Sequence, residues 1–182
     1  GWFRQQLEIQ ANGLSGNLDK FWPDIKDSAW IGGEREGWER VPYWLDGFIP
    51  LAWLLEDEDM KARANKYIYA ILDRQKADGW ICPGNDEDRK TYDVWAVFLI
   101  GKVFTVYWEF TGCERVKESL YRAMKCLYEM MKDDKVALFE WGKFRWFEAL
   151  IPLQFLKEEY NEAWIVELGE MLRSQGIVFT DL

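Results

Sequence analysis

The sequence contains no histidine. Serine–histidine and cysteine–histidine nucleophiles and histidine-ligated zinc are therefore excluded within the chain, and acid–base chemistry would fall to carboxylates, lysine or tyrosine. Cysteine is scarce, because Cys82, Cys113 and Cys126 are the only three, show no metal-binding spacing and argue by their odd number against a disulfide framework. We expect buried or incidental thiols, no metal site and no cofactor.

Long uncharged apolar runs and an excess of basic residues are also lacking. The most apolar stretch, residues 94–110, is interrupted by Lys102 and Glu109, so we expect no membrane-spanning segment. The net charge of −9, from 32 acidic against 23 basic residues, disfavours electrostatic capture of nucleic acid. The chain begins at Gly1, without an initiator methionine or a secretory leader pattern, as we expect of a segment from a longer protein.

Tryptophan, by contrast, is abundant, with 12 residues in a chain whose aromatic share is 17%. An indole offers a flat apolar face and one N–H donor, which suits both a well-filled core and stacking on a sugar ring. The hydrophobic share of 49% over 182 residues is enough for one domain with a sizeable core.

The hydrophobic pattern predicts an all-α fold built on a repeat. Residues 1–37 read as a short N-terminal helix followed, over 18–37, by a long loop of the kind that serves a site. Beyond them, three helical hairpins follow one another at a period of roughly 50 residues, which is typical of an array whose units bury each other's faces. We place these hairpins at 38–79, 80–132 and 133–176.

Each hairpin pairs an apolar helix with an amphipathic one. We expect the apolar helices at 45–56, 92–110 and 147–157 and the amphipathic helices at 58–76, 114–132 and 162–174. If such hairpins close into a ring, the apolar helices lie inside, the amphipathic helices lie outside, and the long loops gather at one end to form a cleft.

The first of these loops carries the densest group of chemistry-bearing side chains. Six lie within nine positions: Trp38, Glu39, Arg40, Tyr43, Trp44 and Asp46. A structural explanation stays open for the charged members, since Asp46 could cap a helix and Glu39 could form an ordinary salt bridge with Arg40. The grouping favours a site, with Glu39 and Asp46 as candidate catalytic acids and the other four as binding residues.

The two later hairpins carry equivalent clusters. Asp93 and Trp95 open the second apolar helix, where the acid could be a cap and the indole could be core. The third cluster adds the candidate binding residues Lys143, Arg145 and Trp146, and Glu148 follows it. Carboxylates and indoles without histidine suit carbohydrate, and glycoside hydrolysis generally needs two acidic side chains flanking the bond, for which Glu39, Asp46, Asp93 and Glu148 are candidates.

Several stretches resemble bacterial proteins related to β-L-arabinofuranosidases. The resemblance is carried, in order along most of the chain, by Trp38-Glu39-Arg40-Val41-Pro42-Tyr43-Trp44-Leu45-Asp46-Gly47, Asp78-Gly79-Trp80, Tyr107-Trp108-Glu109-Phe110-Thr111-Gly112, Glu140-Trp141-Gly142-Lys143-Phe144-Arg145 and Phe179-Thr180-Asp181-Leu182. It implies a six-hairpin α/α toroid acting on glycosidic bonds, of which residues 1–182 make about three hairpins, and a sugar cleft lined by residues 38–46 and 141–145.

The resemblance also implies where the chemistry would lie. In such enzymes a zinc-bound cysteine is the nucleophile and a glutamate is the acid, both later than the matched region, and none of the three cysteines here matches that motif. We therefore expect a glycosidase-like domain with a carbohydrate substrate, partnered by the missing half of the toroid or by a second copy. The alternatives are a non-catalytic carbohydrate-binding or scaffold protein on a helical array and, less favoured because the loops are polar, a ring that binds an isoprenoid or a peptide.

Overall fold

The computed structural model describes residues 1–178, and this part of the chain forms helices and no β-strand, which confirms the predicted all-α class. The longer helices are α1 (Trp2–Asn12), α4 (Arg40–Leu54), α5 (Glu58–Arg74), α6 (Trp95–Thr111), α7 (Glu114–Lys132), α9 (Leu150–Tyr160) and α10 (Ala163–Gln175). The short ones are α2 (Leu18–Phe21), α3 (Pro23–Lys26), α8 (Glu140–Phe144) and the 3₁₀ turns η1 (Ala29–Ile31), η2 (Asp86–Lys90) and η3 (Trp146–Ala149). The matched stretch 179–182 lies outside the described residues.

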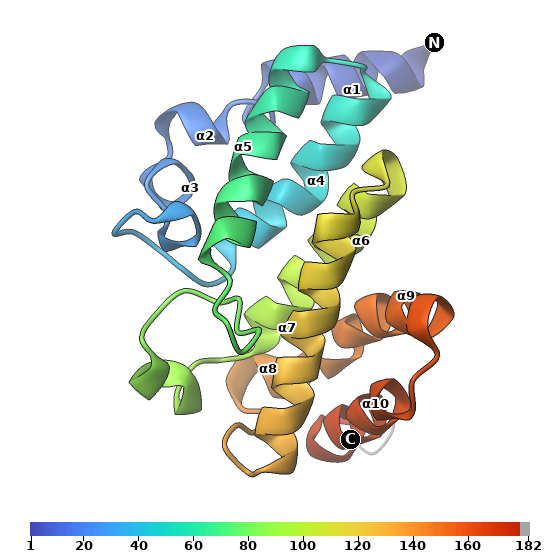
Figure 1. Cartoon of the computed structure of the whole chain (residues 1–182). Helices are drawn as coiled ribbons and strands as arrows, with labels where there is room; N and C mark the ends of the chain where they lie inside the picture. The colour runs from blue at the N-terminus through green and yellow to red at the C-terminus, as the bar shows by residue number, and fades with distance from the viewer. Residues whose placement is uncertain (179–182) are drawn as a thin grey trace.

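The long helices pack in pairs that follow one another along the chain (Figure 1). Helices α4, α6 and α9 are consecutive neighbours, and α5, α7 and α10 each pack against the helix that precedes them in the chain. Helix α6 lies in the middle, contacts α4, α7 and α9, and buries most of its length, including Trp95, Phe98 and Phe104. Burial on most sides explains why its sequence is apolar over most of its length.

Local chemistry sets the helix ends. Helix α5 begins where the Asp57 carboxylate accepts the N–H of Met60 at 2.9 Å, a side-chain N-cap. Helix α6 ends at Gly112, whose φ of 62° is the left-handed conformation that glycine adopts without strain. Helix α4 begins at Arg40 rather than at Leu45 as predicted, because the Glu36 carboxylate accepts the N–H groups of Glu39 and Arg40, at 2.6 and 3.3 Å.

The segment 18–37 is not the open loop that the sequence predicted. It folds into α2, α3 and η1, which pack on α4 and α5 and bury Ile25 and Trp30 in the core. The Trp30 indole donates to the carbonyl of Trp38 at 3.0 Å. The aromatic and aliphatic side chains of this segment pack from helices of about one turn, which are too short to show helical periodicity. The absence of periodicity therefore did not indicate an unstructured loop.

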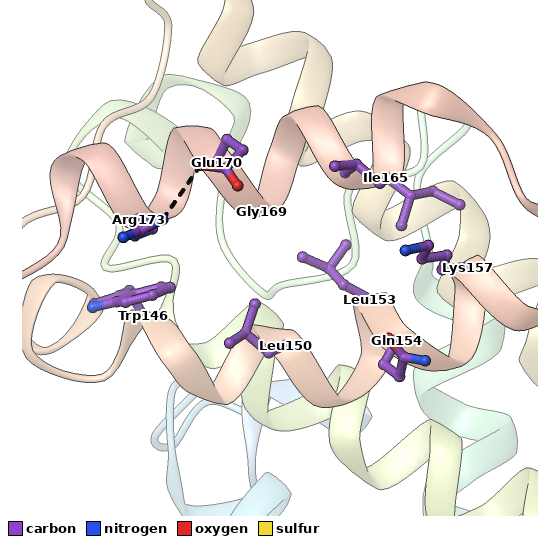
Figure 2. Close-up of a pocket in the computed structure, with 10 residues that line it drawn as sticks. Trp146, Leu150, Leu153, Gln154, Lys157, Ile165, Gly169, Glu170 and Arg173 are labelled. Atoms are coloured by element: carbon purple, nitrogen blue, oxygen red, sulfur yellow. Dashed lines mark ion pairs between the residues drawn. The ribbon is translucent and has the colours of Figure 1, made fainter.

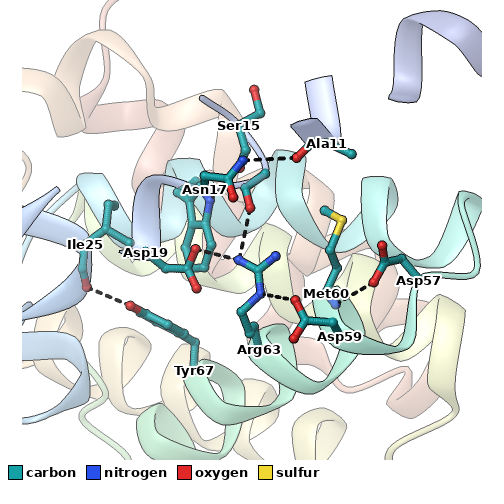
Figure 3. Close-up of polar contacts among 12 residues, drawn as sticks. Ala11, Ser15, Asn17, Asp19, Ile25, Asp57, Asp59, Met60, Arg63 and Tyr67 are labelled. Carbon is teal, nitrogen blue, oxygen red and sulfur yellow. Dashed lines mark hydrogen bonds and ion pairs between the residues drawn. The ribbon is translucent and has the colours of Figure 1, made fainter. Parts of the chain in front are cut away.

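A polar network fastens this N-terminal segment to α5 (Figure 3). The Arg63 guanidinium donates to the carbonyl of Gly16 at 3.0 Å, to Asp19 at 2.7 Å and to Asp59 at 2.9 Å, and it lies 4.9 Å from the centre of the Phe48 ring. One turn further along, the Tyr67 hydroxyl donates to the carbonyl of Ile25 at 3.0 Å. Helix α5 thereby fixes where α2 and α3 lie over α4.

Candidate functional site

Trp95 is the centre of an aromatic cluster at the N-terminal end of α6. Its ring is buried and contacts Trp38 edge-on at 5.3 Å between ring centres, Tyr43 edge-on at 5.5 Å, and Trp141 in a stacked arrangement at 5.6 Å. These partners come from the loop before α4, from α4 itself and from α8. The structure thus brings together the starts of all three hairpins around one indole.

Glu148 and Arg145 place charge on this cluster. One oxygen of Glu148 accepts the Trp95 indole N–H at 2.7 Å, and the other accepts from Arg145 at 3.0 Å. The Arg145 guanidinium lies over the rings of both Trp95 and Trp141, 5.4 and 5.5 Å from their centres. Glu148 raises the pKa of Arg145 above its ordinary value, with smaller contributions from Tyr43 and Glu39, so these four side chains share one electrostatic neighbourhood.

Asp93 holds α8, and with it Trp141, against α6. Its half-buried carboxylate accepts backbone N–H groups from Trp95 at 3.1 Å, Trp141 at 2.9 Å and Gly142 at 3.0 Å. Burial raises the pKa of Asp93 above its ordinary value, although the three N–H donors pull it down. Gly142 allows this contact, because a Cβ there would lie 2.8 Å from the Asp93 carboxylate. Asp93 therefore positions the site and has no free oxygen directed to a ligand.

Tyr43 supplies a hydroxyl at the open side of the cluster and is 41% exposed. Burial raises its pKa; Arg145 opposes that rise, and the carboxylates of Glu148, Glu39 and Asp46 add to it. The hydroxyl therefore remains a protonated donor at neutral pH, surrounded by acceptors. Together, Tyr43 and the 46% exposed Trp141 offer an aromatic surface rimmed by a guanidinium and carboxylates.

The other predicted residues of the first cluster are spread around this surface. Glu39 forms an ion pair with Arg40 at 3.0 Å, and the Arg40 guanidinium lies over the ring of Trp22. Asp46, in the second turn of α4, pairs with Lys102 of α6 at 2.7 Å. Asp46 is therefore inside the helix rather than at its N-cap, and its carboxylate connects two neighbouring helices.

Trp44 does not reach the cleft that the sequence predicted for it. Its ring is 6% exposed, stacks on Phe48 at 4.4 Å between centres, and donates its indole N–H to the carbonyl of Ser15 at 3.0 Å. The sequence prediction put Trp44 in the cleft together with Tyr43, its neighbour in the chain. Successive side chains of a helix, however, point about 100° apart. Trp44 consequently faces the core while Tyr43 faces outward.

Trp146 and Lys143 also lie apart from the Trp95 cluster. The Trp146 indole donates to the carbonyl of Ile177 at 3.1 Å and lines a groove of about 410 Å³ between α9 and α10. Figure 2 shows this groove, with Leu150 and Leu153 on one side and Gly169 on the other. Lys143 is exposed, and its carbonyl accepts the N–H of Ile177. The sequence prediction grouped Lys143 and Trp146 with Arg145, because the direction in which each side chain of a short turn points cannot be read from the sequence.

Two residues central to the cluster, Trp95 and Trp141, were not named as candidate binding residues, although the resemblance placed Trp141 within the cleft-lining stretch 141–145. Trp95 was attributed to the core, which is where its ring lies, yet it carries the contacts of Glu148, Arg145 and Trp141. Trp141 lies four residues before Arg145, whose N–H donates to the Trp141 carbonyl at 2.8 Å. This spacing, at which helical side chains share a face, is the signal that would have identified the pair.

Within the described part of the chain, no helix is long and apolar enough to cross a membrane. The same residues contain no cluster of three or more cysteine, aspartate or glutamate side chains arranged to hold a metal ion. No protein-family model matches the sequence, and no curated protein is significantly similar to it.

Proposed function

We propose that this chain is the sugar-binding portion of a glycoside hydrolase-like domain of the α/α-toroid type. The observation that carries the proposal is the group formed by Trp141, Tyr43, Arg145 and Glu148, because it combines exposed ring faces with a charged donor and a charged acceptor within one neighbourhood. The resemblance of residues 38–47 and 140–145 to β-L-arabinofuranosidase-like proteins makes L-arabinofuranosides the first substrate class to test.

A sugar ring fits this chemistry in a defined way. The exposed face of Trp141 is suited to the C–H face of a sugar, and the indole stack on Trp95 keeps that face fixed. Arg145 and the Tyr43 hydroxyl offer donors to sugar oxygens, and Glu148 and Glu39 offer acceptors to sugar hydroxyls. Because these rings are already held in place by packing, ligand binding costs little side-chain conformational entropy.

The acidic role proposed from the sequence for Glu39 and Asp46 is tested by their amides. If either is an acid of the assembled enzyme, Glu39→Gln or Asp46→Asn lowers turnover by orders of magnitude while the melting temperature stays within a few degrees. Wild-type turnover in both variants of the full-length enzyme would contradict the assignment.

A non-catalytic carbohydrate-binding role is the second candidate, and one observation favours it. Each acidic side chain of the site already has a partner: Glu39 pairs with Arg40, Asp46 with Lys102, Glu148 with Arg145, and Asp93 with backbone N–H groups. Paired carboxylates fix geometry and accept hydroxyl hydrogen bonds, whereas a general acid needs a proton that it can release.

Intrinsic tryptophan fluorescence titrated with a panel of neutral oligosaccharides tests the binding proposal. We expect a saturable change with wild type and at least about tenfold weaker affinity for Trp141→Ala, equivalent to about 1.4 kcal/mol. Trp2→Ala is the matched control, because Trp2 is 70% exposed on α1 and outside the cluster. Release of reducing sugar in the same samples would favour the enzyme, and binding without release would favour the module. Equal affinity of wild type and Trp141→Ala would refute the placement of the site.

A protein partner is the remaining part of the proposal. Exposed apolar side chains occur on the apolar helix of each hairpin or beside it, with Leu54 at the end of α4, Phe110 at the end of α6, and Phe147 and Ile151 in η3 and α9. Apolar surface of this kind is usual at an interface. Sedimentation analysis distinguishes a second copy, which makes a concentration-dependent dimer, from the remaining hairpins of a toroid, which leave this chain monomeric until they are supplied.

A further inference from the structure

A small cavity beside α4 is lined by Tyr43 and not by Trp95. It measures about 270 Å³, is open to solvent on one side, and lies between one face of α4 and the N-terminal segment, with Trp22, Arg40, Tyr43, Trp44, Gly47 and Gln10 in its lining. Ligand pockets for drug-sized molecules start at roughly 300 Å³, so this cavity has room for about one sugar ring.

Gly47 opens this cavity. It lies in the interior of α4, four residues after Tyr43, so the two share a face of the helix. Gly47 is exposed, and a Cβ built there meets no atom within 4 Å, so the position adjoins open space on the solvent side of the cavity. Glycine inside a helix costs roughly 0.5–1 kcal/mol relative to alanine. Glycine at position 47 therefore lowers the stability of the helix and leaves space beside the site.

The walls of the cavity are rigid and its mouth is polar. Trp44 is held by its stack on Phe48 and by its hydrogen bond to Ser15, so one wall is fixed by the core. Arg40, whose side chain is 47% exposed, lies over Trp22 at 5.7 Å from the ring centre and pairs with Glu39. The cavity thus combines flat apolar walls with a guanidinium at its edge, as the surface formed by Trp141 and Arg145 does.

Two side chains connect the cavity to that surface. Tyr43 lines the cavity and also packs edge-on against Trp95. Glu39 pairs with Arg40 and also acts on the pKa values of Tyr43 and Arg145. The two compartments therefore share Tyr43 as a common wall.

We propose that the Gly47 cavity is a second sugar subsite, so that the ligand is an oligosaccharide whose neighbouring units lie on either side of Tyr43. This inference rests on the proposed carbohydrate function and adds the size of the ligand to it. A single sugar would occupy the Trp141 surface alone, and an oligosaccharide would occupy both compartments.

Calorimetric titration of L-arabinose and of an L-arabinofuranose trisaccharide separates the two compartments. With wild type we expect the trisaccharide to bind at least about tenfold more tightly than the monosaccharide. Gly47→Leu fills the cavity without a clash at Cβ and improves helix propensity, so it should fold with an equal or higher melting temperature. We expect it to bind the trisaccharide only as tightly as the monosaccharide and to leave monosaccharide affinity unchanged.

Two controls make the outcome specific. Leu54→Phe changes an exposed apolar side chain on the same helix outside the cavity and should leave both affinities at the wild-type level. Trp141→Ala should weaken both sugars. If Gly47→Leu keeps wild-type affinity for the trisaccharide, the second subsite is refuted while the Trp141 site stands. If wild type binds neither sugar at millimolar concentration, the proposal of an arabinofuranoside site fails and the second subsite fails with it.

Discussion

Arg63 is the side chain whose loss should most weaken the attachment of the N-terminal segment that covers the Gly47 cavity. Its guanidinium joins Gly16, Asp19 and Asp59, and these three interactions are unequal. The Asp59 side chain is 74% exposed and its pairing is worth only a few tenths of a kcal/mol, whereas the Asp19 side chain is 8% exposed.

Arg63→Met keeps most of the aliphatic stem and removes the charge. The buried Asp19 carboxylate then has no cation, which costs roughly 3–5 kcal/mol, and the contact of the guanidinium with Phe48 at 4.9 Å contributed about 1 kcal/mol. Since domains are stable by about 5–15 kcal/mol, a loss of this size is a large fraction of the total.

Urea denaturation followed by tryptophan fluorescence measures the effect, with Asp59→Asn as the matched control. We expect Arg63→Met to lower the free energy of unfolding by about 4–6 kcal/mol and Asp59→Asn by less than about 0.5 kcal/mol. The double variant Arg63→Met/Asp19→Asn should recover a substantial part of the loss, because the buried charge is gone. Equal small effects for Arg63→Met and Asp59→Asn, or strict additivity in the double variant, would refute the reasoning.

Two further predictions follow from buried contacts. Gly142→Ala places a Cβ 2.8 Å from the Asp93 carboxylate, so we expect about 1–3 kcal/mol of destabilisation in urea and greater exposure of the α8 indole to quencher; wild-type values for both would contradict the role of Asp93. Burial raises the pKa of Cys126 to about 11, which leaves roughly a thousandth of it as thiolate at pH 8. A disulfide reagent should therefore label the less buried Cys113 first and label Cys82 and Cys126 only after denaturation; comparable rates for all three in the folded protein would contradict their burial.

The sequence predicted helices well where periodicity and end signals agreed. Helix α7 spans the predicted range 114–132, since its apolar stripe and the glycine before it define both face and start. Helix α6 was recognised as a buried helix because a sequence apolar on nearly all sides requires neighbours around most of the helix. The short turns between 18 and 37 were missed, since no periodicity accompanies helices of one turn.

Side-chain direction was the part of the site that the sequence could not supply. Tyr43 and Trp44 are adjacent and equally aromatic, yet one faces outward and the other is buried, and only the register of α4 decides between them. That register depends on where the helix starts, which the Glu36 carboxylate sets at Arg40. For the same reason, Arg145 lies in the cluster, whereas the side chain of its neighbour Trp146 faces α10.

The most direct test of the sugar site is a ¹H–¹⁵N spectrum of the 12 indole N–H groups recorded during titration with the tightest-binding oligosaccharide of the panel. The account predicts saturable shifts of the signals of Trp141 and of Trp95, whose N–H is donated to Glu148, while the signal of the distant Trp164, whose N–H is donated to Glu162, stays in place. Absence of any shift at saturating sugar, or shifts confined to indoles outside the Trp95 cluster, would contradict it.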